Sequence, residues 1–370
     1  MADRAYEGRR FAGFAADVRD RLGGNGARAN ARLGFLRRSP GRGRSVWIKC
    51  DAREVSGRLG AEIAHAVRER RADLPIVVTF EREHPAVLAR LGNIPNLGYG
   101  YGPADRKAAM RRVLERLRPA IVIALGDALR DRLAAGLRDG GLACCVVHGR
   151  PPPGPADCLG FPHTASELEA WRGRAHRHAP LLSLLVTAQV EPVFQGLAGA
   201  HARALFWVAD APPAAAARIA QTWRASPGAA RDILFLGAPA PGASRLSAWD
   251  KARRPLAPGS VVWVDEERFW PALAASCTAI HLTAPSEPLL WAALGGGRVV
   301  SADRVAGLDL AGQAPVAEVA AGGLVPYWEG LLENPGTARR AADDLRRYFW
   351  QERRCAAQAA ESLVERACAA

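Results

Sequence analysis

The chain has 370 residues, of which 49% are hydrophobic and 24% charged, and this balance is typical of a folded protein with about two domains. No apolar run approaches the roughly 18–20 residues that a membrane-spanning helix needs, and the polar first ten residues are unlike a secretory signal or an anchor. The formal net charge is +13, but 47 of the 50 basic residues are arginines, a bias typical of GC-rich genomes. The charge is not interleaved with aromatic residues on an obvious face, so we expect no nucleic-acid partner.

Residues 1–45 are expected to form a basic N-terminal arm. This segment contains eleven arginines against Asp3, Glu7, Asp17 and Asp20, which gives it a formal charge of +7. Aromatic side chains lie between its charges. Such an arm fits the surface of an anionic membrane. The alternative is a solvated arm that has no particular partner.

Residues 46–200 are expected to form a first α/β domain. Runs of nearly continuous apolar residues alternate with amphipathic segments, a pattern typical of a parallel sheet whose two faces are covered by helices. The predicted strands are 45–50, 74–80, 119–125 and 142–148. The predicted helices are 54–71, a short one after Pro85, 103–118 and 127–138, and 96–101 is expected to be a glycine-rich turn. The pattern predicts a doubly wound, Rossmann-like domain.

Residues 201–370 repeat this alternation and are expected to form a second Rossmann-like domain that ends in helices. The predicted strands are 204–208, 232–236, 260–264, 278–282 and 298–301. The predicted helices are 212–225, 266–275, one after Ser286 and those from 327 onward. The fold class predicted for the chain is therefore α/β, with two doubly wound Rossmann-like domains facing across a cleft. Sheets of this kind bind ligands at the carboxyl ends of their strands.

The segment 285–300, PSEPLLWAALGGGRVV, predicts a turn, a short apolar helix, a glycine stop and a buried strand. We expect the hydroxyl of Ser286 to cap the helix and the carboxylate of Glu287 to sit at its positive end. Gly295 and the two glycines after it would end the helix and would also allow the backbone to lie close to a ligand. The alternative is an ordinary turn between strand, helix and strand.

The seven cysteines show no CxxC pair and no zinc-like spacing with histidine. We therefore expect free thiols in a reducing compartment, several of them buried. The run HRH at 176–178 does not predict a metal site, because alternate residues on a helix point in different directions. No metal is expected.

Several segments resemble the 3-deoxy-D-manno-octulosonic acid (Kdo) transferases, in the order of that family and over essentially the whole chain. VWIKCDAREVSG, from Val46, is similar to the family's VWIHxxSVGE, and LPIVVTF is similar to its LPILVT strand. GLACCVVHGR resembles GIPVVLxNAR, and APSEPLLWAALGGGRVV resembles HNPLEPAALGKPV. The resemblance implies a GT-B fold, with an acceptor-side first domain and a second domain that binds the donor nucleotide.

The resemblance also implies an activity. The family transfers Kdo from CMP-Kdo, with inversion, to a phosphorylated lipid A precursor in lipopolysaccharide core synthesis, and needs no cofactor. The protein would then be cytoplasmic and peripheral at the inner face of the bacterial cytoplasmic membrane. Basic residues of the arm, together with those at 53, 58, 68, 70 and 71, would hold the acceptor's phosphates. Two alternatives stay open, namely a GT-B glycosyltransferase with another nucleotide-sugar donor, and a catalytically inactive relative that binds a glycolipid or a partner.

The site residues follow from the same resemblance. Glu54 matches the family's general base, with Asp51 in reserve, although Glu54 could also be only a favourable charge in the first turn of a helix. Arg150 falls on the family arginine and would pair with the sugar carboxylate or the phosphate. Lys49, inside a strand, is expected to be a surface lysine.

The donor's phosphate is expected to lie at the start of the helix that follows the fourth strand of the second domain. Ser286, Glu287 and the nearby backbone would hold it, with Gly295 closing the same element. His281 ends a strand that leads into this region. It is either a donor-binding residue or a core histidine whose hydrogen bonds are satisfied inside the protein.

Overall fold

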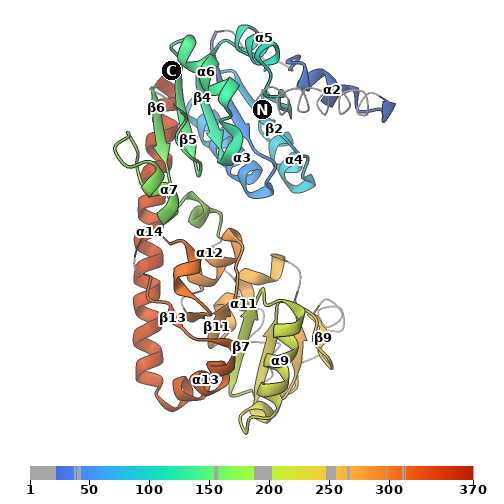
Figure 1. The fold of residues 1–370 in the computed structure, drawn as a ribbon, viewed down its shortest axis with the longest axis vertical. Coiled ribbons are helices and arrows are strands. Elements are labelled where there is room, and N and C mark those ends of the chain that lie inside the picture. Colours follow the sequence, from blue (N-terminus) through green and yellow to red (C-terminus); the bar gives the residue numbers. More distant parts are fainter. Residues whose placement is uncertain are drawn as a thin grey trace, which may run out of the picture. The chain divides into compact units, whose positions relative to one another are not determined.

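The computed structural model describes residues 22–36, 39, 43–153, 157–186, 202–246, 256–264, 267–296, 298–310, 312 and 314–369. The chain divides into two compact units (Figure 1), one comprising Met1–Ala179 with Gln358–Ala370 and the other Pro180–Ala357. The final helix, α14 (Pro335–Ala369), therefore belongs partly to each unit. Most of the expected basic arm, and the expected boundary at 200, lie outside the described residues. No helix in the described part of the chain is long and apolar enough to cross a membrane.

The first unit is built on a six-stranded sheet in which every pair of neighbours is parallel. Its order is β3 (Leu97–Tyr101), β2 (Ile76–Phe80), β1 (Ser45–Cys50), β4 (Pro119–Leu125), β5 (Ala143–Val147) and β6 (Cys158–Phe161). This is the order of dinucleotide-binding sheets, in which the chain reverses direction across the sheet between the first and fourth strands. The point of reversal lies between β1 and β4, and ligands bind beside such a point.

Helices cover both faces of this sheet. On one face α2 (Gly26–Arg32), α5 (Lys107–Leu117) and α6 (Asp131–Asp139) pack in one apolar cluster with side chains of the strands. On the other face α3 (Glu54–Arg70) lies so close that a Cβ on Gly60 would be 2.6 Å from the sulfur of Cys50. Two short helices, α4 (Pro85–Gly92) and α7 (Ala165–Ala170), complete the unit.

The second unit contains a seven-stranded sheet whose neighbours are also all parallel. Its order is β13 (Ala317–Glu318), β12 (Val299–Ala302), β11 (Ala279–Leu282), β7 (Ala204–Ala209), β8 (Asp232–Leu236), β10 (Val261–Trp263) and β9 (Ser244–Arg245). The chain reverses direction between β7 and β11. Both sheets confirm the predicted fold class of two doubly wound α/β units.

The core of the second unit lies between its sheet and two helices, α9 (Pro213–Arg224) and α13 (Leu324–Glu333). The rings of Phe206 and Trp328 stack there with centroids 4.4 Å apart. Two further helices, α11 (Trp270–Ser276) and α12 (Glu287–Gly295), pack against each other. Short 3₁₀ helices lie at Gly126–Ala128, Leu181–Leu185, Ala229–Arg231, Glu267–Phe269, Val305–Leu308 and Ala321–Gly323.

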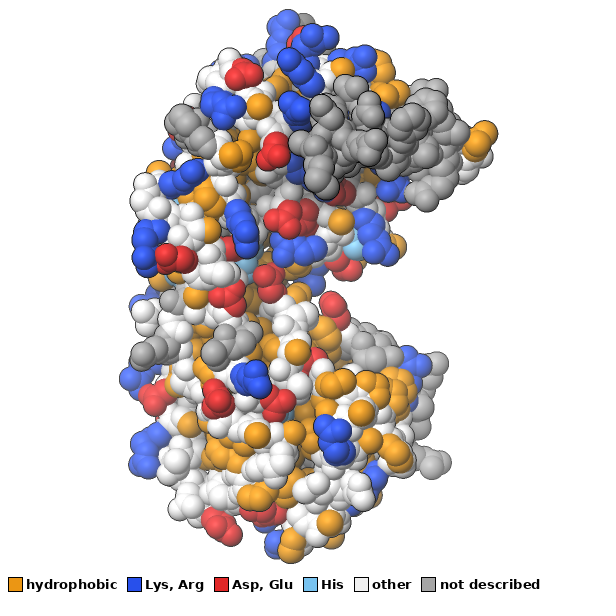
Figure 2. All heavy atoms as spheres, viewed as in Figure 1, with side chains coloured by type: hydrophobic (Ala, Val, Ile, Leu, Met, Phe, Trp, Pro, Cys, Tyr) orange, Lys and Arg blue, Asp and Glu red, His pale blue; other side chains and the backbone are white. Residues whose placement is uncertain are grey.

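Two edge strands of the first unit differ from the prediction. Residues Leu97–Tyr101, LGYGY, were expected to be a turn but form β3, because an edge strand can pair through its backbone alone despite two glycines. The short β6 was not predicted at all. On the face shown in Figure 2, Lys and Arg side chains of the first unit are dispersed among Asp and Glu rather than gathered into one patch.

Candidate functional site

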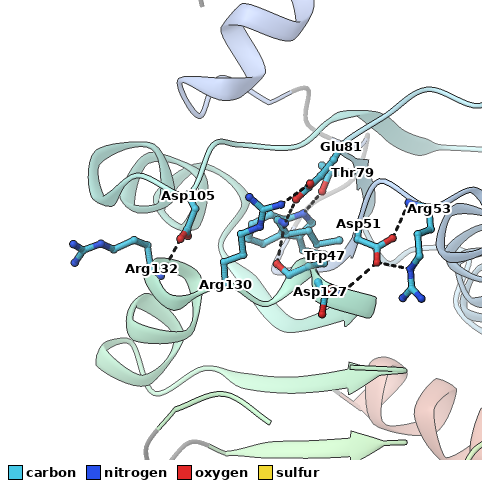
Figure 3. Close-up of polar contacts among 11 residues, drawn as sticks. Trp47, Asp51, Arg53, Thr79, Glu81, Asp105, Asp127, Arg130 and Arg132 are labelled. Atoms are coloured by element: carbon cyan, nitrogen blue, oxygen red, sulfur yellow. Dashed lines mark hydrogen bonds and ion pairs between the residues drawn. The ribbon is translucent and has the colours of Figure 1, made fainter. Parts of the chain in front are cut away.

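Asp51 directly follows β1 and lies at the point of reversal of the first sheet. Its side chain is 8% exposed, and its carboxylate accepts hydrogen bonds from the backbone N–H (2.9 Å) and Nε (2.8 Å) of Arg53 and from the N–H of Asp127 (3.3 Å). Figure 3 shows these contacts joining the ends of β1 and β4. Gly126 must be glycine, because it has a φ of +63° and a Cβ there would overlap the Asp51 carboxylate. Asp51 is thus enclosed by donors from the protein itself.

Glu54 begins α3, three residues after Asp51. Its side chain is 47% exposed, and its Oε2 lies 3.6 Å from Nδ1 of His84. The other ring nitrogen of His84 lies 3.0 Å from the carbonyl oxygen of Ala52, which fixes the imidazole beside the carboxylate. Of the two carboxylates expected from the sequence, Glu54 is therefore the accessible one.

Lys49, in the central strand β1, is buried, so the expectation of a surface lysine was wrong. Its side chain is 3% exposed, because a central strand of a parallel sheet is covered on both faces. Its ammonium donates to the carbonyl oxygen of Ala128 (2.9 Å) and lies 3.4 Å from Oε1 of Glu81. The other oxygen of Glu81 accepts from Arg130 (2.7 Å), as Figure 3 shows. Burial lowers the pKa of Lys49, and the charge of Glu81 opposes that shift.

Lys49, Glu81 and Arg130 line a cavity of about 310 Å³, which we call the basic cavity. Five cationic and two acidic side chains line it, which leaves a formal surplus of three positive charges. The charged lining residues are Arg28, Arg32, Lys49, Glu81, Asp105, Arg106 and Arg130. Arg106 and Arg130 are also the residues that precede α5 and α6, and neither caps its helix with its side chain. The positive ends of two helices therefore lie at the rim of the cavity.

A second cavity, of about 570 Å³, lies beside the first and is mostly apolar. The two share Phe80 and Tyr101, whose rings meet edge to face with centroids 5.5 Å apart. Its other walls include Phe35, Leu36 and Val77. We call this the apolar cavity.

Three charged residues of the basic cavity, Glu81, Asp105 and Arg130, were not predicted from the sequence. Each follows a strand of the first sheet or precedes a helix that returns from it, and the carboxyl ends of parallel strands meet at one edge. Glu81 comes directly after the predicted strand 74–80. Its position after that strand was the available signal.

Arg150 follows β5 at the same edge and is exposed. Before it, Gly149 packs so closely on the carbonyl of Gly126 that a side chain would not fit, which brings the ends of β4 and β5 together. His148 is buried, its Nε2 donates a hydrogen bond to the carbonyl oxygen of Ala179 at 2.9 Å, and its ring lies against that of His163 with centroids 3.8 Å apart. Burial, and then the charge of His163, lower the pKa of His148 well below its ordinary value.

Three arginines expected to hold acceptor phosphates instead have partners inside the first unit. Arg68 donates to the backbone carbonyls of residues 71, 72 and 96. Arg70 pairs with Glu361 (3.1 Å), and Arg71 pairs with Asp73 (2.9 Å). All three lie at the end of α3, which runs back from the carboxyl edge of the sheet toward the opposite edge.

In the second unit, Asp210 follows β7 at the point of reversal. Its two carboxylate oxygens accept hydrogen bonds from the N–H groups of Thr283 and Ala284, both at 3.1 Å, across the reversal. Its backbone has a φ of +57°. Burial, with a contribution from Asp303, raises the pKa of Asp210 to about 6. Asp51 and Asp210 thus occupy corresponding positions in the two units.

His281 lies inside β11 and is fully buried. Its Nδ1 is 3.1 Å from the hydroxyl of Ser301, and its Nε2 is 3.3 Å from Oδ1 of Asp303. Burial lowers the pKa of His281, although Asp303 opposes the shift. Both ring nitrogens of this histidine therefore have partners within the second unit.

The helix α12 forms as expected, but its cap does not. Ser286 stands at the N-cap position and its hydroxyl makes no capping hydrogen bond, so that expectation was wrong. Glu287 lies in the first turn, as predicted. Gly295 lies close to the side chains of Phe349 and Val186, since a Cβ there would be 3.1 Å from atoms of both.

Among the residues that the structure describes, no group of three or more His, Cys, Asp or Glu side chains could hold a metal ion.

No family model matches the chain, and no curated protein matches it. Solved structures do resemble it. UDP-GlcNAc 2-epimerase from Neisseria meningitidis, bound to UDP-GlcNAc, has a TM-score of 0.56 at 12% identity over 87% of this chain and 99% of its own. Anabaena Alr3699/HepE, in complex with UDP and glucose, has 0.54 at 13% identity over 87% and 100%. The glycosyltransferase SnogD from Streptomyces nogalater has 0.50 at 15% identity over 88% and 100%. These likenesses agree with the two parallel sheets and show a GT-B fold.

Proposed function

We propose that the protein is a glycosyltransferase that takes a sugar from a nucleotide-sugar donor, with the donor on the second unit and the acceptor on the first. The observation that carries this proposal is the pair of doubly wound units. Each has a point of reversal at the carboxyl edge of its sheet, where such sheets bind ligands. Structures that resemble the chain over 87–88% of its length include a complex with UDP-GlcNAc, a complex with UDP and glucose, and a glycosyltransferase.

Glu54 is the general base in this proposal. Its carboxylate takes the proton of an acceptor hydroxyl while the oxygen attacks the anomeric carbon, and the bond from that carbon to the nucleotide phosphate breaks with inversion. A base must be within hydrogen-bond reach of the hydroxyl, and Glu54 is accessible whereas Asp51 is enclosed. The imidazole of His84 beside it keeps the carboxylate oriented.

The donor's phosphate would lie at the start of α12, where the helix end favours an anion and the exposed Ser286 hydroxyl makes no capping bond. Asp210 and Asp303 would repel a phosphate placed directly over the point of reversal. The phosphate therefore belongs nearer Ser286, and Glu287 would turn toward a ribose hydroxyl. Arg150, on the first unit, would pair with an anionic group of the sugar.

A finer form of the proposal is transfer of Kdo from CMP-Kdo to an anionic lipid A-type acceptor. The sequence resemblance supports it, and so does an apolar cavity beside a basic one in the first unit. Such an acceptor would place the protein at the inner face of the cytoplasmic membrane, with the basic arm on anionic lipid. Another nucleotide sugar is the alternative donor, and the nucleotides in the resembling structures favour it.

The second candidate function is a catalytically inactive relative that binds a glycolipid or a partner. The observation that favours it is the internal pairing of Asp51 and Asp210, whose carboxylates are taken up by the protein's own donors at both points of reversal.

The test is a donor panel containing CMP-Kdo, UDP-GlcNAc, UDP-glucose and GDP-mannose, each with a tetraacylated lipid A precursor. Nucleotide release with a matching mass increase of the acceptor supports the transferase, and the productive donor decides between its two forms. Conversion of the donor into an isomer without acceptor modification would contradict it in favour of an epimerase. Donor binding without any turnover would favour the inactive relative.

A further inference from the structure

Residues 162–179, which we call the connector, hold the loop that carries Arg150. The connector follows β6 and ends where the second unit begins. Backbone hydrogen bonds fasten its last part to β6, among them the one from the N–H of Gly160 to the carbonyl oxygen of Ala175, at 2.9 Å. The strand β6 is the neighbour of β5, which the loop at 148–152 follows. The connector is therefore anchored to the sheet beside that loop.

Two side chains of the connector bind the backbone on either side of Arg150. The indole Nε1 of Trp171, which is buried, donates to the carbonyl oxygen of Gly149 at 2.8 Å. The guanidinium of Arg174 donates to the carbonyl oxygen of Pro152. One contact lies directly before Arg150 and the other lies two residues after it. The chain is thus held on both sides of this arginine.

His148 supplies a third attachment of the loop. Its Nε2 donates to the carbonyl oxygen of Ala179, the last residue of the connector. Its φ is +53°, in the left-handed region that a residue with a side chain adopts only at a cost in free energy. Such a conformation persists where the surrounding contacts impose it, and it is often found at functional sites. The connector therefore fixes the backbone that leads to Arg150.

The side chain of Arg150 differs from its backbone in having no attachment. It is exposed, and among the described residues its guanidinium takes part in no hydrogen bond or ion pair. A guanidinium binds a carboxylate best through two parallel hydrogen bonds, which require a defined direction of approach. Misplacement of a binding group by about 1 Å can cost about 10²-fold in rate. The position of the loop backbone should therefore decide how well Arg150 binds an anion.

We infer that Trp171 and Arg174 are positioning residues, which hold the loop so that the guanidinium of Arg150 meets the carboxylate of a sugar acid. This inference rests on the proposed function for the role of Arg150. It adds the residues that set the position of Arg150 and the class of donor sugar that the site selects.

Calorimetry tests the inference through donor binding, without an acceptor. The probes are CMP-Kdo and UDP-glucuronate, whose sugars carry a carboxylate, and UDP-glucose, whose sugar is neutral. For the sugar-acid donor that binds wild type more tightly, we expect Arg150→Gln to raise the Kd at least about tenfold. Trp171→Phe, which keeps a ring but lacks the N–H, and Arg174→Gln should each raise the same Kd about three- to tenfold. The Kd of UDP-glucose should stay within about twofold in all three variants.

A double variant separates positioning from a general loss of stability. Trp171→Phe added to Arg150→Gln should raise the Kd of the sugar-acid donor no further, because a residue that acts only through Arg150 has no effect once that guanidinium is gone. Arg174→Gln in the same background should behave alike. Because Arg174 is exposed, its variant should fold even if Trp171→Phe does not.

Each positioning residue has a matched control in the same unit. Trp47→Phe also removes a buried indole donor, which in wild type bonds the hydroxyl of Thr79 at 2.9 Å. Arg172→Gln removes an exposed arginine two residues from Arg174, and Arg172 makes no printed contact with the loop but pairs within the connector. Both controls should leave the Kd of the sugar-acid donor within about twofold of wild type.

Three results would overturn the inference. The first is a raised Kd in Arg150→Gln with wild-type values in Trp171→Phe and Arg174→Gln, and the second is full additivity in the double variants. The third is a wild-type Kd in Arg150→Gln, or no binding of either sugar-acid donor to wild type. In that third case turnover of UDP-glucose would leave the proposed transferase standing, whereas no turnover of any donor would remove both.

Discussion

The ammonium of Lys49 and the carboxylate of Glu81 lie 3.4 Å apart across β1 and β2, so these two neighbouring strands of the first sheet end in a partly buried ion pair. Lys49 is 3% exposed and Glu81 27% exposed. The pair stands between the apolar core of the unit and the basic cavity. A change in either side chain should therefore affect both the stability of the unit and the charge of the basic cavity.

The coupling between Lys49 and Glu81 can be measured. Lys49→Met should destabilise the protein, because it leaves the carbonyl oxygen of Ala128 without its donor and removes one partner of Glu81. Glu81→Gln should also destabilise it, because it removes the negative charge that faces the buried ammonium of Lys49. The double variant should cost less than the sum of the two by about 1 kcal/mol or more, since no unpaired charge remains at Lys49. Urea unfolding of the four proteins gives the coupling. Additivity within about 0.5 kcal/mol would show that the two side chains do not interact.

Gly126 should tolerate substitution much less well than Gly141, although both have positive φ values of +63° and +58°. Gly141→Ala meets no atom within 4 Å and should cost only the backbone strain, about 1–2 kcal/mol. Gly126→Ala adds an overlap with the Asp51 carboxylate and the Arg53 guanidinium, and should cost at least about 3 kcal/mol. Chemical denaturation measures both. Equal costs would mean that Asp51 is not held against Gly126 in solution.

Asp51 and Glu54 should separate in their effects on stability. In Asp51→Asn an amide NH₂ would face the donors of Arg53 and Asp127, and we expect a loss of about 1–3 kcal/mol in the free energy of unfolding. Glu54→Gln changes a half-exposed side chain and should stay within about 0.5 kcal/mol of wild type. Melting curves of the two variants make the comparison. If Glu54→Gln destabilises as much as Asp51→Asn, Glu54 is structural.

The raised pKa of Asp210 predicts a dependence of stability on pH. The folded protein holds this proton up to about pH 6, against 3.8 for an ordinary aspartate, so between these values the folded state binds more protons than the unfolded state. The associated stability is therefore present at low pH and lost as the pH rises through about 6. The melting temperature of wild type relative to Asp210→Asn should fall between about pH 4 and 7 and then level off. Parallel curves for the two proteins across this range would contradict the shift.

The sequence predicts the fold well because buried parallel strands are nearly continuous apolar runs, as in the fully buried segment PAIVIAL of β4. It fails at β3, whose glycines resemble a turn, and at Lys49, because a charged residue in a strand suggests an exposed position. It also fails at Ser286, which occupies a cap position without bonding there. The basic cavity could not be predicted in detail, since Glu81, Asp105 and Arg130 come from three separate loops. Their side-chain contacts depend on how the strands and helices pack.

The central claim, sugar transfer with Glu54 as base, is tested most directly by the rate of nucleotide release from the productive donor in wild type and Glu54→Gln. A general base contributes about 10²–10⁴-fold, so we expect the rate to fall at least about a hundredfold in the variant while the donor's Kd stays unchanged. Equal rates in the two proteins, or no release by wild type from any donor, would contradict it.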